Sequence, residues 1–337
     1  MRRTTRLTSG IAVAAALVAT VPSCGGDGDE LTIYSGRELS LIQPILERFA
    51  EETGIDIAVR DGTTADLALQ IEAEGDRSPA DVFLSQSPGA VGYLDGLGRL
   101  APLPEDILER VSEEDRAPDG DWVGVTGRVR TLVWNPELID ETELPESVLD
   151  LTDARYAGLL AVAPGNASFQ DFITGMRSEL GDDAAAEWLD GIVANDPTTF
   201  PNNISILDAV NRGEVAMGLI NHYYWFESAE EDPGQPSRLH FFDDGDLGSM
   251  LLVTAASVLD TSEHAEEAQR LVTFLLEEEA QTYFATETLE YPLAAGVEPV
   301  EGLFPLDDIV SSRIAFDDLG TLGRTLELID ESGLPDQ

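Results

Sequence analysis

The chain has 337 residues, which is about twice the usual size of a single domain, so two lobes are expected. It contains 65 acidic and 19 basic residues, the latter all arginine, and the net charge of −46 argues against a nucleic-acid-binding role. The carboxylates are spread along a chain that is 43% hydrophobic, which predicts a folded protein with an acidic shell. We interpret the charge as surface chemistry, such as salt adaptation; a field that attracts cations is the alternative.

The N-terminal segment has the pattern of an export signal. Basic residues near its start precede an apolar run over residues 11–21, which suits a signal peptide but is too short to span a membrane comfortably. Cys24, the only cysteine, follows this run and excludes an internal disulfide. We expect residues 1–23 to be a signal peptide and residues 24–30 to be the cysteine and a flexible acidic linker.

The position of Cys24 resembles that of the lipidated cysteine of bacterial lipoproteins, whose thiol is diacylated and becomes the new N-terminus. Pro22 is atypical for that motif, and the alternative is an ordinary signal peptide with an incidental cysteine. We prefer lipidation at Cys24, which would hold the exported chain on the outer side of the cytoplasmic membrane or in the periplasm.

From residue 31 onward, short apolar strands alternate with amphipathic helices. Strands are predicted over residues 31–34, 54–60 and 81–85, and helices over residues 38–52 and 64–74. This alternation with short connections predicts a mostly parallel sheet that is covered by helices on both faces. We assign residues 31–126 to the first lobe.

A long β-branched stretch over residues 123–135 predicts a strand that leaves the first lobe and serves as a hinge. The second lobe is assigned to residues 127–254. Its predicted strands cover residues 159–163 and 215–224. Two of its predicted helices cover residues 168–180 and 183–194, and a third begins at an Asn cap at 202–203 and ends at Gly213.

A second hinge-like strand over residues 250–259 is expected to return to the first lobe. A long amphipathic helix over residues 261–284 follows it. We therefore expect residues 255–337 to complete the first lobe with C-terminal helices.

Residues 221–226 read NHYYWF and place two tyrosines where a predicted strand meets a loop. Open α/β folds collect ligand groups at such strand ends. Ferric iron is a hard ion that selects oxygen donors, and it can displace the phenolic proton. Because side chains alternate along a strand, Tyr223 and Tyr224 could share one ion only if the strand has ended there. The alternative is an aromatic packing cluster over residues 223–226.

Eight short segments, taken together and in their order along the chain, indicate a protein family more specifically than the tyrosine pair alone. They are YSGR (34–37), ETGI (52–55), SPADVF (78–83), GRVR (127–130), NASFQ (166–170), PNN (201–203), NHYYW (221–225) and EYPL (290–293). In these segments the chain resembles the bacterial ferric-iron-binding proteins, the two-lobed periplasmic relatives of transferrin, over almost the whole mature chain.

The resemblance implies the two-lobed, type II periplasmic-binding-protein fold: each lobe a mostly parallel α/β sheet flanked by helices, joined by two hinge strands. It implies a monomeric binding protein, not an enzyme, that captures Fe3+ with a synergistic anion, carbonate or phosphate. Hinge closure would present the loaded form to the permease of an ABC transporter.

The resemblance also assigns roles to individual residues. It makes Tyr223 and Tyr224 the metal ligands from the second lobe and Arg128 the anion-holding arginine, for which a hinge salt bridge is the alternative. Asn166, Ser168 and Asn203 lie at predicted helix starts, where polar groups and backbone N–H groups could hold the anion. Their alternative role is plain helix capping, which we favour for Asn202.

The sequence departs from the family at several ligand positions. Glu38 replaces a histidine and Gln86 replaces a glutamate, and Leu39 and Phe169 stand where some relatives have a further tyrosine. We expect Tyr223, Tyr224 and Glu38 to bind the metal, with anion and water completing the coordination sphere. Arg37 and Gln86 are expected in the wall of the pocket.

The alternative functions are those of an enzyme and of a binding protein for another solute. An enzyme has little support, because the three histidines show no metal-ligand spacing and no Gly-rich phosphate loop precedes a helix. A binding protein of the same fold for another solute, such as thiamine, a phosphonate, a polyamine or a sugar, stays open, since one fold hosts many ligands. For a polyamine, Asp81, Glu38, Trp225 and Tyr223 could mimic an acidic aromatic cage.

Overall fold

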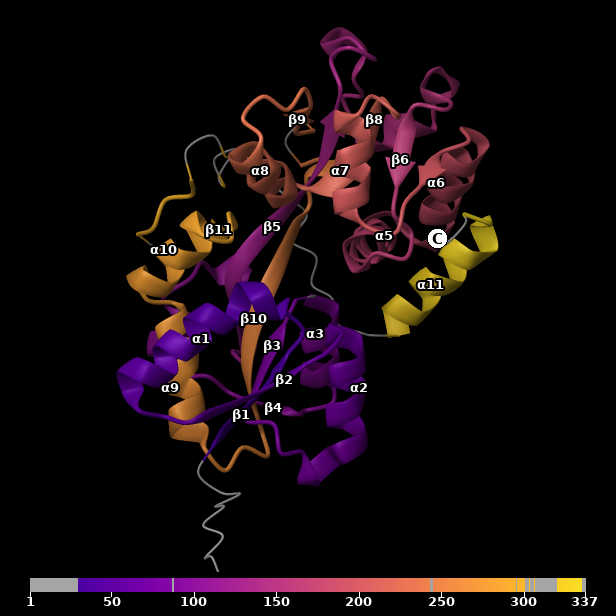
Figure 1. Cartoon of the computed structure of the whole chain (residues 1–337). Coiled ribbons are helices and arrows are strands. Elements are labelled where there is room, and N and C mark those ends of the chain that lie inside the picture. The colour runs from indigo at the N-terminus through magenta and orange to yellow at the C-terminus, as the bar shows by residue number, and fades with distance from the viewer. Residues whose placement is uncertain are drawn as a thin grey trace, which may run out of the picture.

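The computed structural model describes residues 30–86, 88–242, 245–294, 296–300, 303, 306 and 320–334. The predicted signal peptide, Cys24 and most of the linker lie outside these ranges. Within them, every helix is too short or too polar to span a bilayer. Two groups of helices and strands are joined by two long strands, β5 (Trp122–Trp134) and β10 (Leu251–Leu259), as Figure 1 shows.

Lobe 1 is the group built mainly from the first part of the chain. Its elements are β1 (Leu31–Ser35), α1 (Leu39–Thr53), β2 (Ile57–Asp61), α2 (Thr64–Glu74), β3 (Val82–Ser85), α3 (Pro88–Gly96), β4 (Leu100–Ala101), α4 (Glu105–Leu108), α9 (Ala265–Leu275), α10 (Glu278–Thr286) and β11 (Tyr291–Pro292). β1 pairs in parallel with both β2 and β3, as the strand–helix alternation predicts. β10 then lies antiparallel between β3 and β5.

Lobe 2 continues the same sheet on the other side of β5. Its elements are β6 (Leu160–Val162), α5 (Ala167–Leu180), α6 (Asp182–Ala194), β7 (Thr198–Thr199), α7 (Asn203–Asn211), β8 (Met217–Asn221), α8 (His222–Glu231), β9 (Arg238–His240) and α11 (Gly320–Ser332). The strand order through both lobes is β2-β1-β3-β10-β5-β8-β6-β7. The first part of β5 pairs with β10 and its last part pairs with β8, so β5 carries one chain segment through both lobes.

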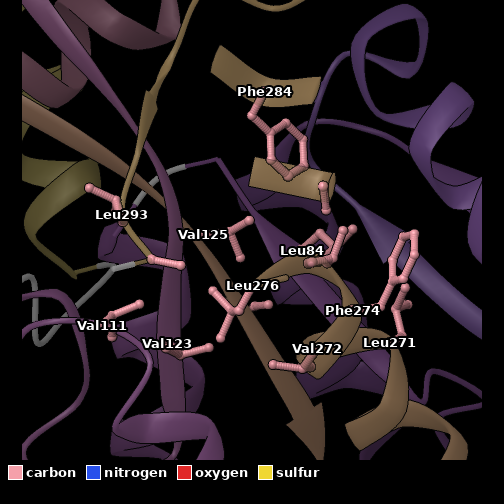
Figure 2. Close-up of a cluster of buried hydrophobic side chains, with 14 of the residues drawn as sticks. Leu84, Val111, Val123, Val125, Leu271, Val272, Phe274, Leu276, Phe284 and Leu293 are labelled. Carbon is pink, nitrogen blue, oxygen red and sulfur yellow. The ribbon is translucent and has the colours of Figure 1, made fainter. Parts of the chain in front are cut away.

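Each lobe has its own hydrophobic core. In lobe 1, α9 and α10 pack apolar side chains against β3 and β5, with Leu84, Val125, Leu271 and Phe284 among the contacts (Figure 2). In lobe 2, α5 and α6 bury aromatic side chains beside the sheet, and Phe172 and Trp188 lie edge to face. Two separate cores allow the lobes to move about the connecting strands.

The predicted single helix over residues 261–284 is wrong, because the chain forms α9 and α10 with a break at Leu276 and Glu277. The buried side chain of Gln281 stabilises the break. Its Nε2 donates to the carbonyls of Leu275 at 2.7 Å and Val125 at 3.0 Å, and its Oε1 accepts from the amide of Ala294. The end of α9 is thus capped by a side chain instead of by continued helix.

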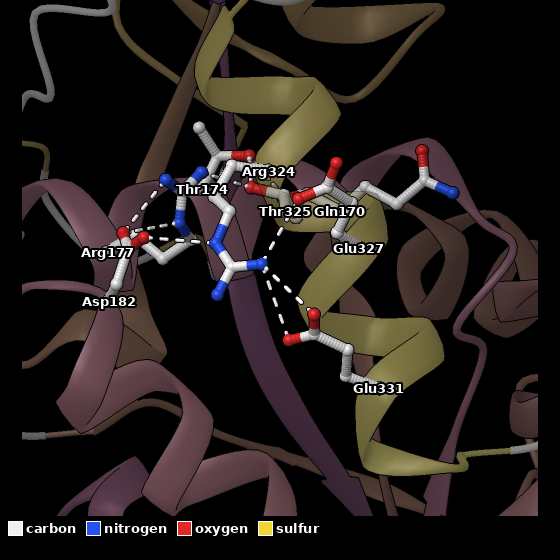
Figure 3. A network of polar contacts seen from close by, with 8 residues as sticks. All are labelled: Gln170, Thr174, Arg177, Asp182, Arg324, Thr325, Glu327 and Glu331. Atoms are coloured by element: carbon white, nitrogen blue, oxygen red, sulfur yellow. Dashed lines mark hydrogen bonds and ion pairs between the residues drawn. The ribbon is translucent and has the colours of Figure 1, made fainter.

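The C-terminal helix α11 packs on lobe 2, beside α5 and α6, and not on lobe 1 as expected for all of residues 255–337 (Figure 1). Leu328 and Ile329 enter the lobe 2 core. On the same helix, Thr325 contacts Thr174 at 2.8 Å, and Arg324 lies 3.2 Å from Asp182 (Figure 3). The amphipathic pattern predicts a helix but does not say which lobe receives its apolar face.

The docking of α11 leads to a stability prediction. Leu328→Ala should lower the free energy of unfolding by about 2–5 kcal/mol, because it leaves a cavity in the lobe 2 core. Leu326→Ala, on the exposed face of the same helix, should change it by less than about 0.5 kcal/mol. Urea unfolding measures both. Equal effects of the two substitutions would contradict the docking.

Candidate metal centre

A cleft of about 570 Å³ contains most of the predicted site residues. Lobe 1 lines it with the loop between β1 and α1, the start of α2, Gln86 and Arg128. Lobe 2 lines it with the start of α5, the end of β8, the start of α8 and Leu326 of α11. Of the predicted metal and anion ligands, Asn203 alone does not line the cleft but lies buried behind its wall.

The two tyrosines lie in the first turn of α8 and not in a strand. β8 ends at Asn221, which precedes the helix, so the predicted strand to residue 224 is three residues too long. Because side chains in a helix do not alternate between two faces, neighbouring residues can reach one site there. The rings of Tyr223 and Tyr224 have centroids 4.1 Å apart, and both residues line the cleft.

Tyr223 is buried, whereas Tyr224 is half-buried. Burial raises the pKa of Tyr223 well above its ordinary value, and Tyr224 adds to the effect, while Arg37 and Arg128 oppose it. The phenol of Tyr223 is therefore protonated at neutral pH in the absence of a cation. A bound trivalent cation would displace this proton and keep the phenolate.

A buried charge network forms the lobe 1 wall. Arg37 lies 2.7 Å and Arg128 lies 3.7 Å from the carboxylate of Glu290, and all three side chains are almost fully buried. Burial and the neighbouring Arg37 lower the pKa of Arg128. Arg128 thus makes the salt bridge of its alternative role and lines the cleft as well. Glu290 was not predicted as a site residue, although it begins the EYPL segment.

Gln86 and Glu38 are placed differently. Gln86 is part of the wall: its carbonyl accepts from Nη2 of Arg128, and its side-chain amide can donate to the Gly36 carbonyl and accept from Nη1 of Arg128. Glu38 is exposed, precedes α1 and makes no side-chain capping bond. Gly36 lets this loop approach α2, because a Cβ there would lie 1.9 Å from Oγ1 of Thr64.

The lobe 2 wall combines hydrogen-bonded neutral polar groups with the carboxyl group of Asp171, which also lines the cleft. Asn166 caps α5 by accepting from the Ser168 amide, and its Oδ1 also accepts from Nδ2 of Asn203 at 3.2 Å. Asn203 donates as well to Oγ of Ser168 at 3.1 Å. Asn202 caps α7, as expected. Asn166 therefore has both the capping role and a place in the cleft wall.

Arg130 and His222 were not predicted. Arg130 is buried and donates to Asn221 at 2.9 Å, and the signal for it is the second arginine of GRVR. His222 accepts at Nδ1 from the Val129 amide and donates at Nε2 to the Leu289 carbonyl. Burial lowers the pKa of His222 to about 4, so the ring is neutral with both nitrogens engaged. It supports the fold next to the tyrosines instead of offering a metal ligand.

The donor set for a metal therefore depends on tyrosine. In the part of the chain that the structure describes, no group of three or more His, Cys, Asp or Glu side chains could hold an ion. Tyr223, Tyr224 and Glu38 line one cleft, and their oxygen donors, once deprotonated, would suit a hard trivalent cation.

Comparisons with known proteins agree with this chemistry. The profile of the family described as bacterial extracellular solute-binding protein matches residues 77–302. The chain is 30% identical over 308 residues to the Fe(3+)-binding periplasmic protein of Serratia marcescens, covering 90% of each chain. It is 29% identical over 326 residues to the major ferric iron-binding protein of Neisseria meningitidis serogroup A, covering 96% of this chain and 97% of the relative. The crystal structure of iron-bound HitA from Pseudomonas aeruginosa is similar with a TM-score of 0.83 at 36% identity, covering 90% of this chain and 99% of HitA.

Proposed function

The chain belongs to the bacterial extracellular solute-binding proteins, and we propose from this premise that it captures ferric iron, together with an oxyanion, between its two lobes. The observation that carries the proposal is the pair Tyr223 and Tyr224 at the start of α8, lining a cleft with buried arginines. Ferric-iron binding is also what the names of the similar full-length proteins state.

In this proposal each lobe supplies part of the iron site. Tyr223 and Tyr224 bind as phenolates from lobe 2, and Glu38 adds a carboxylate from lobe 1. The exposed position of Glu38 suits a ligand that reaches the metal as the lobes close about β5 and β10. Closure is then stabilised by the ion that bridges the lobes.

The oxyanion, carbonate or phosphate, would occupy the arginine side of the cleft. Nη1 of Arg37 is buried and, among the described residues, has no hydrogen-bond partner, and Arg37 and Arg128 both line the cleft. Such N–H groups favour an anion that completes their hydrogen bonds. Asn166 and Ser168 offer further polar groups on the opposite wall.

Delivery completes the proposed function. The closed, loaded form would be recognised by the permease of an ABC transporter, to which we expect the chain to bind as a monomer. Lipidation of Cys24 after removal of residues 1–23 would keep the exported protein at the outer face of the cytoplasmic membrane. The protein has a transport role, and we propose no catalytic residue.

The first test is the visible absorption spectrum of the purified protein during titration with a ferric salt plus carbonate or phosphate. We expect a red-brown phenolate-to-iron charge-transfer band that saturates at one iron per chain. Gallium, a trivalent ion without that transition, serves as control and should compete with iron without producing the band. If no anion supports the band, an organic oxyanion such as a phosphonate becomes the better candidate, because the arginines favour an acidic ligand over a polyamine.

A further inference from the structure

Arg130 is a buried arginine that belongs neither to the proposed metal ligands nor to the proposed anion ligands. It follows Arg128 by two residues in β5, so both side chains leave the same face of the strand. Arg128 contacts Gln86 and Glu290 on the lobe 1 side. Arg130 pairs in register with Asn221 of β8 and lies on the lobe 2 side.

The hydrogen bonds of Arg130 join residues from three separate elements. Its Nη1 lies 2.9 Å from Oδ1 of Asn221, 3.4 Å from Oγ of Ser168 and 3.5 Å from Oδ1 of Asn203. These atoms belong to the end of β8, the start of α5 and the start of α7. One guanidinium group therefore connects these three polar residues of lobe 2.

The electrostatic setting of Arg130 differs from that of the other two buried arginines. Arg37 and Arg128 share the carboxylate of Glu290, whereas the three hydrogen bonds of Arg130 go to neutral oxygen atoms and the acidic side chain near it is that of Asp171. Its Nη2 is buried and, among the described residues, has no hydrogen-bond partner. A buried cation with an incomplete set of partners is costly, and an oxyanion in the adjoining cleft would add its negative charge to that of Asp171.

We propose that Arg130 is a positioning residue for the oxyanion of the cargo: it holds Ser168, Asn203 and Asn221 in place and puts a positive charge behind the lobe 2 wall. This inference rests on the proposed iron-and-anion function. Arg130 acts through its neighbours, because Ser168 and Asn221 line the cleft and Arg130 itself does not. Arginine suits this role because a lysine side chain is shorter, so its ammonium group would not reach the position of Nη1 and would lose part of these contacts.

The test compares ferric affinity with and without phosphate or carbonate, measured by competition with a ferric chelator, and takes the ratio as the anion gain. Arg130→Gln should reduce the anion gain about tenfold or more, and Arg130→Lys should give an intermediate value. Arg177→Gln is the matched control, because Arg177 is a largely buried arginine of lobe 2 outside the cleft and its substitution should leave the gain unchanged.

The anion gain distinguishes a residue that positions the anion from one that only supports the fold. Loss of a residue that only supports the fold would weaken iron binding equally with and without anion. An unchanged anion gain in a folded Arg130→Gln variant would overturn the proposal. If that variant does not fold, Arg130→Lys decides, since it keeps the charge but loses the reach to the three acceptors, and a gain equal to that of the parent would overturn the proposal. If the parent protein shows no charge-transfer band with iron and any anion, the proposed iron function itself is refuted.

Discussion

Replacing Tyr223 by phenylalanine is expected to lower ferric affinity by more than about 100-fold and to weaken the charge-transfer band. Phenylalanine has no oxygen atom that could bind Fe3+ as a negatively charged ligand. Even substitutions of residues that only orient metal ligands lower metal affinity by about 10–100-fold, so the loss of a ligand should cost more. The fold should survive, since the substitution removes one hydroxyl and keeps the ring that contacts Tyr224. Chelator competition and the visible spectrum measure both effects.

Tyr283→Phe is the matched control for this prediction. Its hydroxyl donates to the Leu41 carbonyl at 2.9 Å on lobe 1, and Tyr283 does not line the cleft between the lobes. We expect a stability loss of about 1 kcal/mol and unchanged ferric affinity. Wild-type affinity in Tyr223→Phe would return the tyrosine pair to the alternative of an aromatic packing cluster.

The fold could be predicted from the sequence where local pattern decides the outcome. Alternating strands and helices, with glycine or asparagine at helix ends, predicted α2 with its actual bounds and β5 and α6 within one residue at each end. Errors arose where a distant contact decides. The break between α9 and α10 depends on Gln281 reaching Val125, and the docking of α11 depends on the lobe 2 core.

In the candidate site, too, local sequence pattern predicted some residues and distant contacts decided the others. The residue types of Tyr223 and Tyr224 suggested a hard metal, with an aromatic packing cluster as the alternative, whereas the anion role of Arg128 came from the resemblance to the ferric-iron-binding proteins. Glu290 and Arg130 stand in the EYPL and GRVR segments, but their roles were not predicted, because those roles come from partners that only the folded sheet brings near. Arg130 meets Asn221 because β5 and β8 are antiparallel neighbours, and no local pattern predicts that pairing.

Glu290→Gln should lower the free energy of unfolding by about 3–5 kcal/mol, because it leaves Arg37 and Arg128 buried without a counter-charge. Glu279→Gln is the control: its ion pair with Arg48 is 2.8 Å long but exposed, so the loss should stay below about 1 kcal/mol. Urea unfolding measures both variants. Phosphate should restore part of the stability of Glu290→Gln if the anion binds these arginines, since a ligand that binds only the folded state stabilises it. Equal stability of the two variants would mean that Glu290 does not compensate the buried cations.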